Sequence, residues 1–275
     1  MKAFQFSFPL PQRHRSTVFP LINLRHPRNL REIYRRGFLL VAILVTGILS
    51  AQQTVTAASV SPEFVKVNQA YANALNLRMK INYSLYADHT TQEKEQNEDG
   101  VFMKQNKNTY SELFGITSLC NSKTCITVDK TEKVLVVTDP SDKKIKNPGE
   151  VDIDSLLTIC SSISIQEKEN GIKIYRMRFD NAPYTTYEAV DVCINPKTFF
   201  FEKIVLYFRE ETSYDASGKK VETKPRLEIS YSSIEVNPVF EKDQFSESRF
   251  IISSGKKITC APAFATYHLI NNKLQ

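Results

Sequence analysis

Two of the five cysteines stand close enough together for redox chemistry. Cys120 and Cys125 are separated by Asn-Ser-Lys-Thr. Four intervening residues let two strands face each other across a turn, so this pair is the disulfide candidate in an oxidising compartment. The odd number of cysteines leaves at least one thiol unpaired or bonded to another chain. The other three can equally serve as small buried hydrophobic residues.

Other patterns that could do chemistry are weak. The sequence has no Gly-x-Ser-x-Gly elbow, no Gly-rich phosphate loop and no His-Glu-x-x-His motif. His89 sits among polar residues, His268 follows Tyr267 near the end of the chain, and Cys-x4-Cys stands alone as a ligand pattern. The sequence therefore predicts a non-enzymatic protein with no catalytic residues, no metal site and no cofactor.

The basic charge belongs to the start of the chain. Residues 1–51 hold eight Lys/Arg and one acid, which leaves 28 basic and 29 acidic residues in the remainder. A nearly neutral remainder gives no reason to expect nucleic acid as a partner.

The basic segment runs into an apolar stretch at residues 37–51, which has the form of a secretory signal. Fifteen residues are few for a bilayer span, which needs roughly 20. We predict a basic leader plus signal peptide over residues 1–58, and a single domain over residues 59–275 with a C-terminal extension. The alternative is a retained anchor with its basic end inside the cell.

The domain begins with one amphipathic helix. Ser61 is a suitable N-cap, Pro62 suits the first helical position and Glu63 places an acid in the first turn. Apolar residues then recur at helical spacing through residue 74. We expect a helix from Ser61 whose apolar stripe needs a cover.

From Leu75 the period changes to two, and the apolar residues 75, 77, 79, 81, 83 and 85 alternate with polar ones. Many later segments are also extended and end at turn residues, with a second short helix expected at about residues 154–163. This pattern is typical of a hairpin-rich antiparallel protein.

One late strand is apolar on both sides. Alternation places Phe199, Phe201, Val205 and Tyr207 on one face and residues 200, 204, 206 and 208 on the other. Both faces therefore need a cover, which helices, an apolar ligand or a second sheet layer could provide.

The order of these parts resembles the periplasmic lipoprotein-carrier (LolA-like) superfamily, as it occurs in Bacteroidetes-type proteins. The resemblance covers roughly residues 61–250, and it rests on short patterns at residues 100–104 (Gly-Val-Phe-Met-Lys), 110, 128–129, 139–140, 192–198, 226–231 and 243–246. It implies an α+β, mainly β fold: a curved, incomplete antiparallel β-barrel with short helices covering the concave face, where acyl chains bind. The family's shuttle has Arg after the Lys of the second strand, whereas Gln105 follows Lys104 here.

We therefore expect an exported periplasmic protein that binds an acylated or other apolar ligand in a concave cavity. The alternative location is the inner membrane, with the domain facing the periplasm, and contact with the membrane is transient or made through the uncleaved anchor. The predicted apolar lining consists of Met79, Ile81, Tyr83, Leu85, Met103, Phe199 and Phe201, each of which could also be ordinary core.

The alternative function is a cell-envelope scaffold that uses the same curved sheet, or an exposed strand edge, to dock a protein complex. The C-terminal stretch, residues 260–270, either plugs the concavity or docks elsewhere.

Overall fold

A computed structural model describes residues 53–140, 153–168, 170–182, 185–214, 220–255 and 257–273. The basic and apolar segments of the predicted leader lie outside these residues. Within this part of the chain, no helix is long and apolar enough to cross a membrane.

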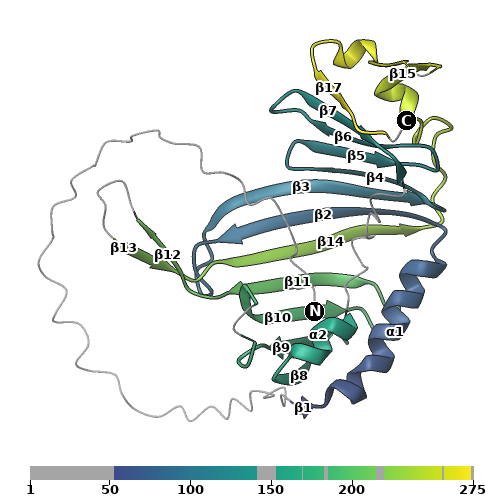
Figure 1. Cartoon of the computed structure of the whole chain (residues 1–275). Helices are drawn as coiled ribbons and strands as arrows, with labels where there is room; N and C mark the ends of the chain where they lie inside the picture. The colour runs from purple at the N-terminus through teal and green to yellow at the C-terminus, as the bar shows by residue number, and fades with distance from the viewer. Residues whose placement is uncertain are drawn as a thin grey trace, which may run out of the picture. The chain divides into compact units, whose positions relative to one another are not determined.

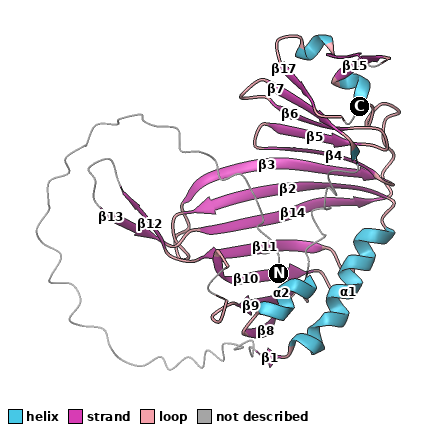
Figure 2. Cartoon of the chain, viewed as in Figure 1, coloured by secondary structure: helices cyan, strands magenta, loops and turns pink. Residues whose placement is uncertain are grey.

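The fold consists of one long helix, one short helix and many strands (Figures 1 and 2). In chain order the elements are β1 (Gln53–Val55), α1 (Ala57–Asn73), β2 (Asn76–Tyr86), β3 (Lys94–Gln105), β4 (Asn108–Leu113), β5 (Ile116–Cys120), β6 (Cys125–Asp129), β7 (Val134–Thr138), α2 (Ile153–Ile159), β8 (Ser162–Glu167), β9 (Lys173–Arg178), β10 (Tyr187–Ile194), β11 (Phe201–Phe208), β12 (Glu211–Tyr214), β13 (Lys220–Thr223), β14 (Arg226–Val236), the 3-10 helix η2 (Glu247–Arg249), β15 (Ile251–Ser254), β16 (Lys257–Cys260), the 3-10 helix η3 (Pro262–Phe264) and β17 (His268–Asn271).

Thirteen of the described strands form one curved, unclosed sheet in the order β1-β8-β9-β10-β11-β14-β2-β3-β4-β5-β6-β7-β17 (Figure 1). All neighbouring pairs in this sheet are antiparallel except β17, which runs parallel to β7. The pairs β12–β13 and β15–β16 form separate hairpins. The strands β1 and β17 are the two edges, so the barrel is incomplete as predicted.

Helices α1 and α2 cover the concave face, which we call the helix face. Four residues of α1, Val60, Phe64, Val67 and Tyr71, are almost fully buried in one apolar cluster. The sheet contributes buried residues to this cluster from strands β2, β3, β8, β9, β10, β11 and β14. The predicted fold class, mainly β with short helices over the concave face of an incomplete barrel, is confirmed.

Helix α1 begins earlier than the sequence predicted. It starts at Ala57, so Pro62 lies inside the helix instead of at its first position. Val60 is 1% exposed, and this packing contact holds a turn that precedes the proline. Strand β1 and the first residues of α1 therefore fall within the segment predicted as leader.

The opposite face of strands β4 to β7, which we call the outer face, has its own core. Direct partners on this face are Tyr110, Leu119, Ile126 and Val137, and Phe245, Phe250 and Ile251 of the C-terminal segment complete the cluster. Cys260, Phe264, Tyr267 and Leu269 pack against it. The C-terminal stretch therefore docks on the outer face and leaves the concave face to the helices.

Candidate ligand-binding face

The predicted lining residues of β2 lie in one row on the helix face. Met79 is 0% exposed and Ile81 is 6% exposed, and both belong to the core cluster under α1. Tyr83 is half-buried against that cluster, and burial raises its pKa to about 12. Leu85 is half-buried further along the same alternating row.

Phe201 is the centre of the aromatic part of this face. It is fully buried, with its ring centroid 5.7 Å from that of Tyr71 on α1 and 6.2 Å from that of Tyr231 on β14. Phe199 is half-buried in the preceding turn, and its ring lies 5.3 Å from the ammonium nitrogen of Lys66.

A β-bulge changes the predicted alternation around Phe201. Ile194 pairs with Phe201 and Cys193 with Lys203, so the ladder skips Glu202. Phe201 consequently shares the helix face with Ile204 and Leu206, whereas alternation had placed it with Val205 and Tyr207. Alternation alone does not locate a bulge, and for this reason the sequence pattern misassigned the row.

Met103 lies away from the other predicted lining residues. Its neighbour Phe102 pairs with Met79 on the helix face, so Met103 points to the outer face and packs against the C-terminal cluster. The structure therefore brings Met79, Ile81, Tyr83, Phe199 and Phe201 to one cluster and places Met103 in the other.

Polar contacts also fasten α1 to this face. Lys104, only 9% exposed, donates from Nζ to the carbonyl oxygen of Tyr71 at 3.0 Å. The backbone N–H of Phe201 donates to the hydroxyl of Tyr71 at 3.3 Å, and Lys173 pairs with Glu63 at 2.7 Å. Because Tyr71 lies in the last turn of α1, the charge of Lys104 also stabilises the negative end of the helix dipole. In the sequence, the only sign of this role is that a lysine follows the apolar residues 101–103.

The cluster also contains an unsatisfied polar group. The hydroxyl of Tyr175 is buried without a hydrogen-bond partner among the described residues, and its ring lies 5.3 Å from that of Phe64 on α1. A buried unsatisfied hydroxyl costs about 1–3 kcal/mol. The apolar packing of this cluster has to offset that cost.

A cavity of about 290 Å³ lies at the edge of this face, between the turn before β11 and the end of β14. Its apolar lining is Phe200, Phe201, Tyr231, Ile234 and Val236. Its polar lining is Asn195, Thr198, Glu202, Ser232 and Ser233.

The predicted disulfide is present. Cys120 and Cys125 are bonded and directly opposite in the β5–β6 hairpin, whose turn is ordered by Asn121 accepting from the backbone N–H groups of Lys123 and Thr124.

The other three thiols, Cys160, Cys193 and Cys260, are free. Burial raises the pKa of each, to about 11 for Cys193, so these thiols are poor nucleophiles at neutral pH.

Replacing both Cys120 and Cys125 with serine is expected to lower the free energy of unfolding by about 2 kcal/mol, the value for closing so short a loop in the unfolded chain. Urea denaturation measures the change, with Cys260→Ser as the control. Dithiothreitol should destabilise the native protein equally and leave the double variant unaffected; equal sensitivity of both proteins to reductant would contradict this.

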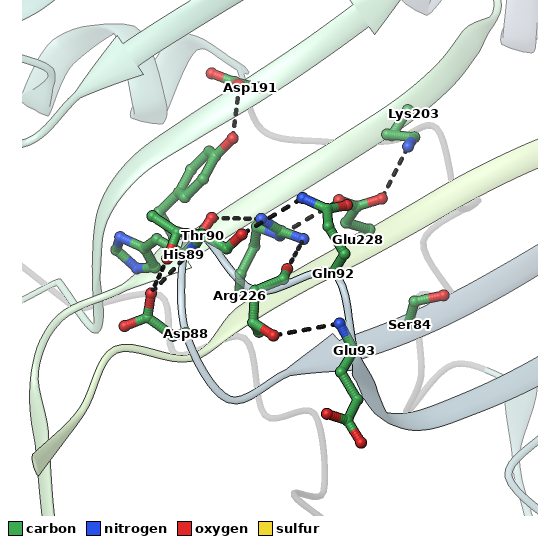
Figure 3. A network of polar contacts seen from close by, with 12 residues as sticks. Ser84, Asp88, His89, Thr90, Gln92, Glu93, Asp191, Lys203, Arg226 and Glu228 are labelled. Carbon is green, nitrogen blue, oxygen red and sulfur yellow. Dashed lines mark hydrogen bonds and ion pairs between the residues drawn. The ribbon is translucent and has the colours of Figure 1, made fainter. Parts of the chain in front are cut away.

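A polar network occupies the end of β2 and the start of β14, which lie side by side (Figure 3). Arg226 donates to the carbonyl oxygens of His89 and Thr91, pairs with Glu228 at 3.3 Å and stacks on Tyr86 at 4.1 Å. The ring of His89 contacts the carbonyl oxygen of Phe208 at 3.0 Å. These contacts fasten the loop after β2 to its neighbours, so His89 has a structural role here.

The described residues contain no group of three or more His, Cys, Asp or Glu side chains placed to hold a metal ion.

None of the known protein-family models and none of the curated proteins matches this sequence. Among solved structures, the chain is similar to a DUF1329 family protein from Desulfovibrio piger, with 11% identity and a TM-score of 0.34 over 70% of this chain and 98% of that one. It is also similar to a domain described as an outer membrane lipoprotein-sorting protein from Vibrio parahaemolyticus (10% identity, TM-score 0.33, 70% and 99% covered). A LolA superfamily protein from Nitrosomonas europaea gives 13% identity and a TM-score of 0.30, with 71% and 99% covered. With TM-scores below 0.5, none of these likenesses assigns the chain to a family.

Proposed function

We propose that this protein binds acyl chains on the helix face of its curved sheet, in the space that α1 fills in the closed state. One observation carries the proposal: among the described residues, a continuous apolar cluster spanning seven strands is covered by two helices, while the C-terminal segment packs on the other face. The larger part of this cover, α1, is one amphipathic helix and can move as a unit.

The energies of the two covers are comparable. Burial of a large apolar side chain is worth about 1.5–3 kcal/mol, so the four buried residues of α1 contribute about 6–12 kcal/mol. An acyl chain that buries about ten methylene groups contributes about 8 kcal/mol. Exchange of the helix for an acyl chain is therefore close to balanced, as a carrier that loads and unloads requires.

Lys104 fits this proposal as the contact that holds α1 closed. It supplies from β3 a positive charge to the last turn of the helix. The family's shuttle has Arg at the position of Gln105. Because Gln105 carries no charge, the positive charge that holds the helix comes from the neighbouring Lys104. Membership in the LolA-like superfamily, and in its Bacteroidetes-type group, is part of the proposal and rests on the short sequence patterns between residues 100 and 246.

We propose a periplasmic location, because a basic segment followed by an apolar one has the form of a secretory signal. Retention of this segment would anchor the domain at the inner membrane and is the alternative location. In either location the chemistry is binding and carrying, not catalysis.

Native mass spectrometry of protein purified from an exported fraction tests the proposal. The native mass is expected to exceed the denatured mass by that of a lipid, which organic extraction then releases. The denatured mass also shows whether the leader has been removed. Identical native and denatured masses, together with failure to take up added 1-dodecanoylglycerol, would contradict acyl binding.

A second candidate function is a cell-envelope scaffold that docks a protein complex. The observation that favours it is the complete burial of Met79, Phe201 and Tyr175, since a filled core needs no ligand. A scaffold should show no lipid in the native mass and no effect of added lipid on α1.

A further inference from the structure

The cavity beside β14 is lined in part by residues of the helix-face cluster, among them Phe200, Phe201 and Tyr231. Its floor is formed by Phe200, Phe201 and Tyr231, which are buried, whereas Thr198, Ser232 and Ser233 at its rim are exposed. Tyr71 of α1 packs on the same two phenylalanines, with ring centroids 4.9 Å from Phe200 and 5.7 Å from Phe201. Two aromatic rings thus separate the cavity from the core under α1.

The described lining of the cavity has one charged residue, which is negative. Glu202 supplies a carboxylate, and its Oε1 accepts a hydrogen bond from Asn195 Nδ2 at 2.9 Å. Asn195 is itself held, because its Oδ1 accepts from the backbone N–H groups of Lys197 and Thr198. No lysine or arginine is among the described residues that line the cavity. Among the lining residues, this charge favours a positively charged donor over a phosphate or a free carboxylate.

The backbone around the cavity is strained on both sides. Phe199, next to the lining residues Thr198 and Phe200, has φ 58°, and Ser233 in the lining has φ 50°. A bulky residue in the left-handed region is an outlier that costs about 1–3 kcal/mol and persists where the surroundings hold it, most often at ligand sites.

Both strands at the cavity also leave their regular pairing. The β10–β11 ladder is irregular between Cys193 and Ile194, opposite Glu202, and the β14–β2 ladder is irregular between Ser232 and Glu235. Bulges of this kind re-aim side chains next to functional sites. The two irregularities place Glu202 and Ser233 on one cavity.

We propose that this cavity is the head-group site for the apolar ligand, and that it selects an amphiphile with an amine head group. The ammonium group lies against Glu202 and the hydroxyls of the rim. The alkyl chain passes Phe200 and Phe201 toward the core, where it displaces Tyr71 and with it the end of α1. This inference rests on the proposed function, because it requires an alkyl chain on the helix face.

Three probes with the same chain length test the selection: dodecylammonium chloride, 1-dodecanoylglycerol and sodium dodecanoate, each titrated calorimetrically into the exported protein below its micelle concentration. Dodecylammonium is expected to bind at least about tenfold more tightly than dodecanoate. Glu202→Gln should weaken dodecylammonium binding about tenfold and change dodecanoylglycerol binding less than twofold.

Glu95→Gln is the matched control for loss of one negative charge. Glu95 is exposed and lies at the start of β3, which pairs with the far end of β2 from the cavity. This variant should bind all three probes as the native protein does.

The outcomes separate the two proposals. Binding of dodecanoylglycerol with no preference for dodecylammonium, or equal losses in the Glu202 and Glu95 variants, would overturn the head-group site and leave acyl binding standing. Failure of all three probes to bind would overturn the proposed function and the head-group site together.

Discussion

Phe201→Ala is expected to lower the free energy of unfolding by about 3–5 kcal/mol, the range for removing a large aromatic side chain from a packed core. Phe201 is 0% exposed and contacts rings from both α1 and β14. Alanine would leave a cavity inside the aromatic cluster. The neighbouring strands hold the backbone there and limit the collapse of this cavity. Urea denaturation measures the change.

Phe114→Ala is the control for Phe201→Ala. The Phe114 side chain is 40% exposed and has one ring contact, with Tyr83 at 5.4 Å, so we expect a much smaller loss. A loss at Phe201 no larger than the loss at Phe114 would mean that the helix face is already open in solution. In that case α1 would not cover the helix face of the native protein.

Lys104→Met is expected to raise the population of molecules with α1 released by about 10- to 150-fold. A hydrogen bond to a charged group is worth about 1.5–3 kcal/mol, and the substitution removes the donor while a similar apolar stem remains. Since Lys104 Nζ contacts the carbonyl oxygen of Tyr71, the effect should concentrate at the end of α1. Amide hydrogen exchange in the last turns of α1 measures it.

Lys107→Met provides the matched control, because Lys107 is an exposed lysine in the turn that follows β3. It should leave exchange in α1 unchanged. If the two lysine variants behave alike, the contact of Lys104 does not hold α1. If exchange rises equally in β10 and α1, Lys104 stabilises the whole fold and not the helix in particular.

The long elements followed from the sequence because their periods are strong. The alternation from residue 75 onward predicted β2, and the helical spacing of Phe64, Val67 and Tyr71 predicted α1 with its buried stripe. The Cys120–Cys125 spacing predicted the disulfide hairpin. In each case the local pattern and the tertiary environment favour the same structure.

The remaining features depend on contacts that local patterns do not encode. The early start of α1 depends on packing of Val60, and the bulge at Glu202 depends on pairing with β10. The sequence grouped Met103 with the lining residues of β2, and only the register with β2 places it on the outer face. Likewise, the helix contact of Lys104 joins residues 33 positions apart.

Hydrogen exchange of α1 in the presence of an acyl ligand shows directly whether acyl chains and α1 compete for one face. Addition of 1-dodecanoylglycerol is expected to accelerate exchange in residues 64–74 while β10 stays protected. Saturated binding of this ligand with unchanged or greater protection of α1 would contradict this competition, because the ligand would then occupy a site elsewhere on the molecule.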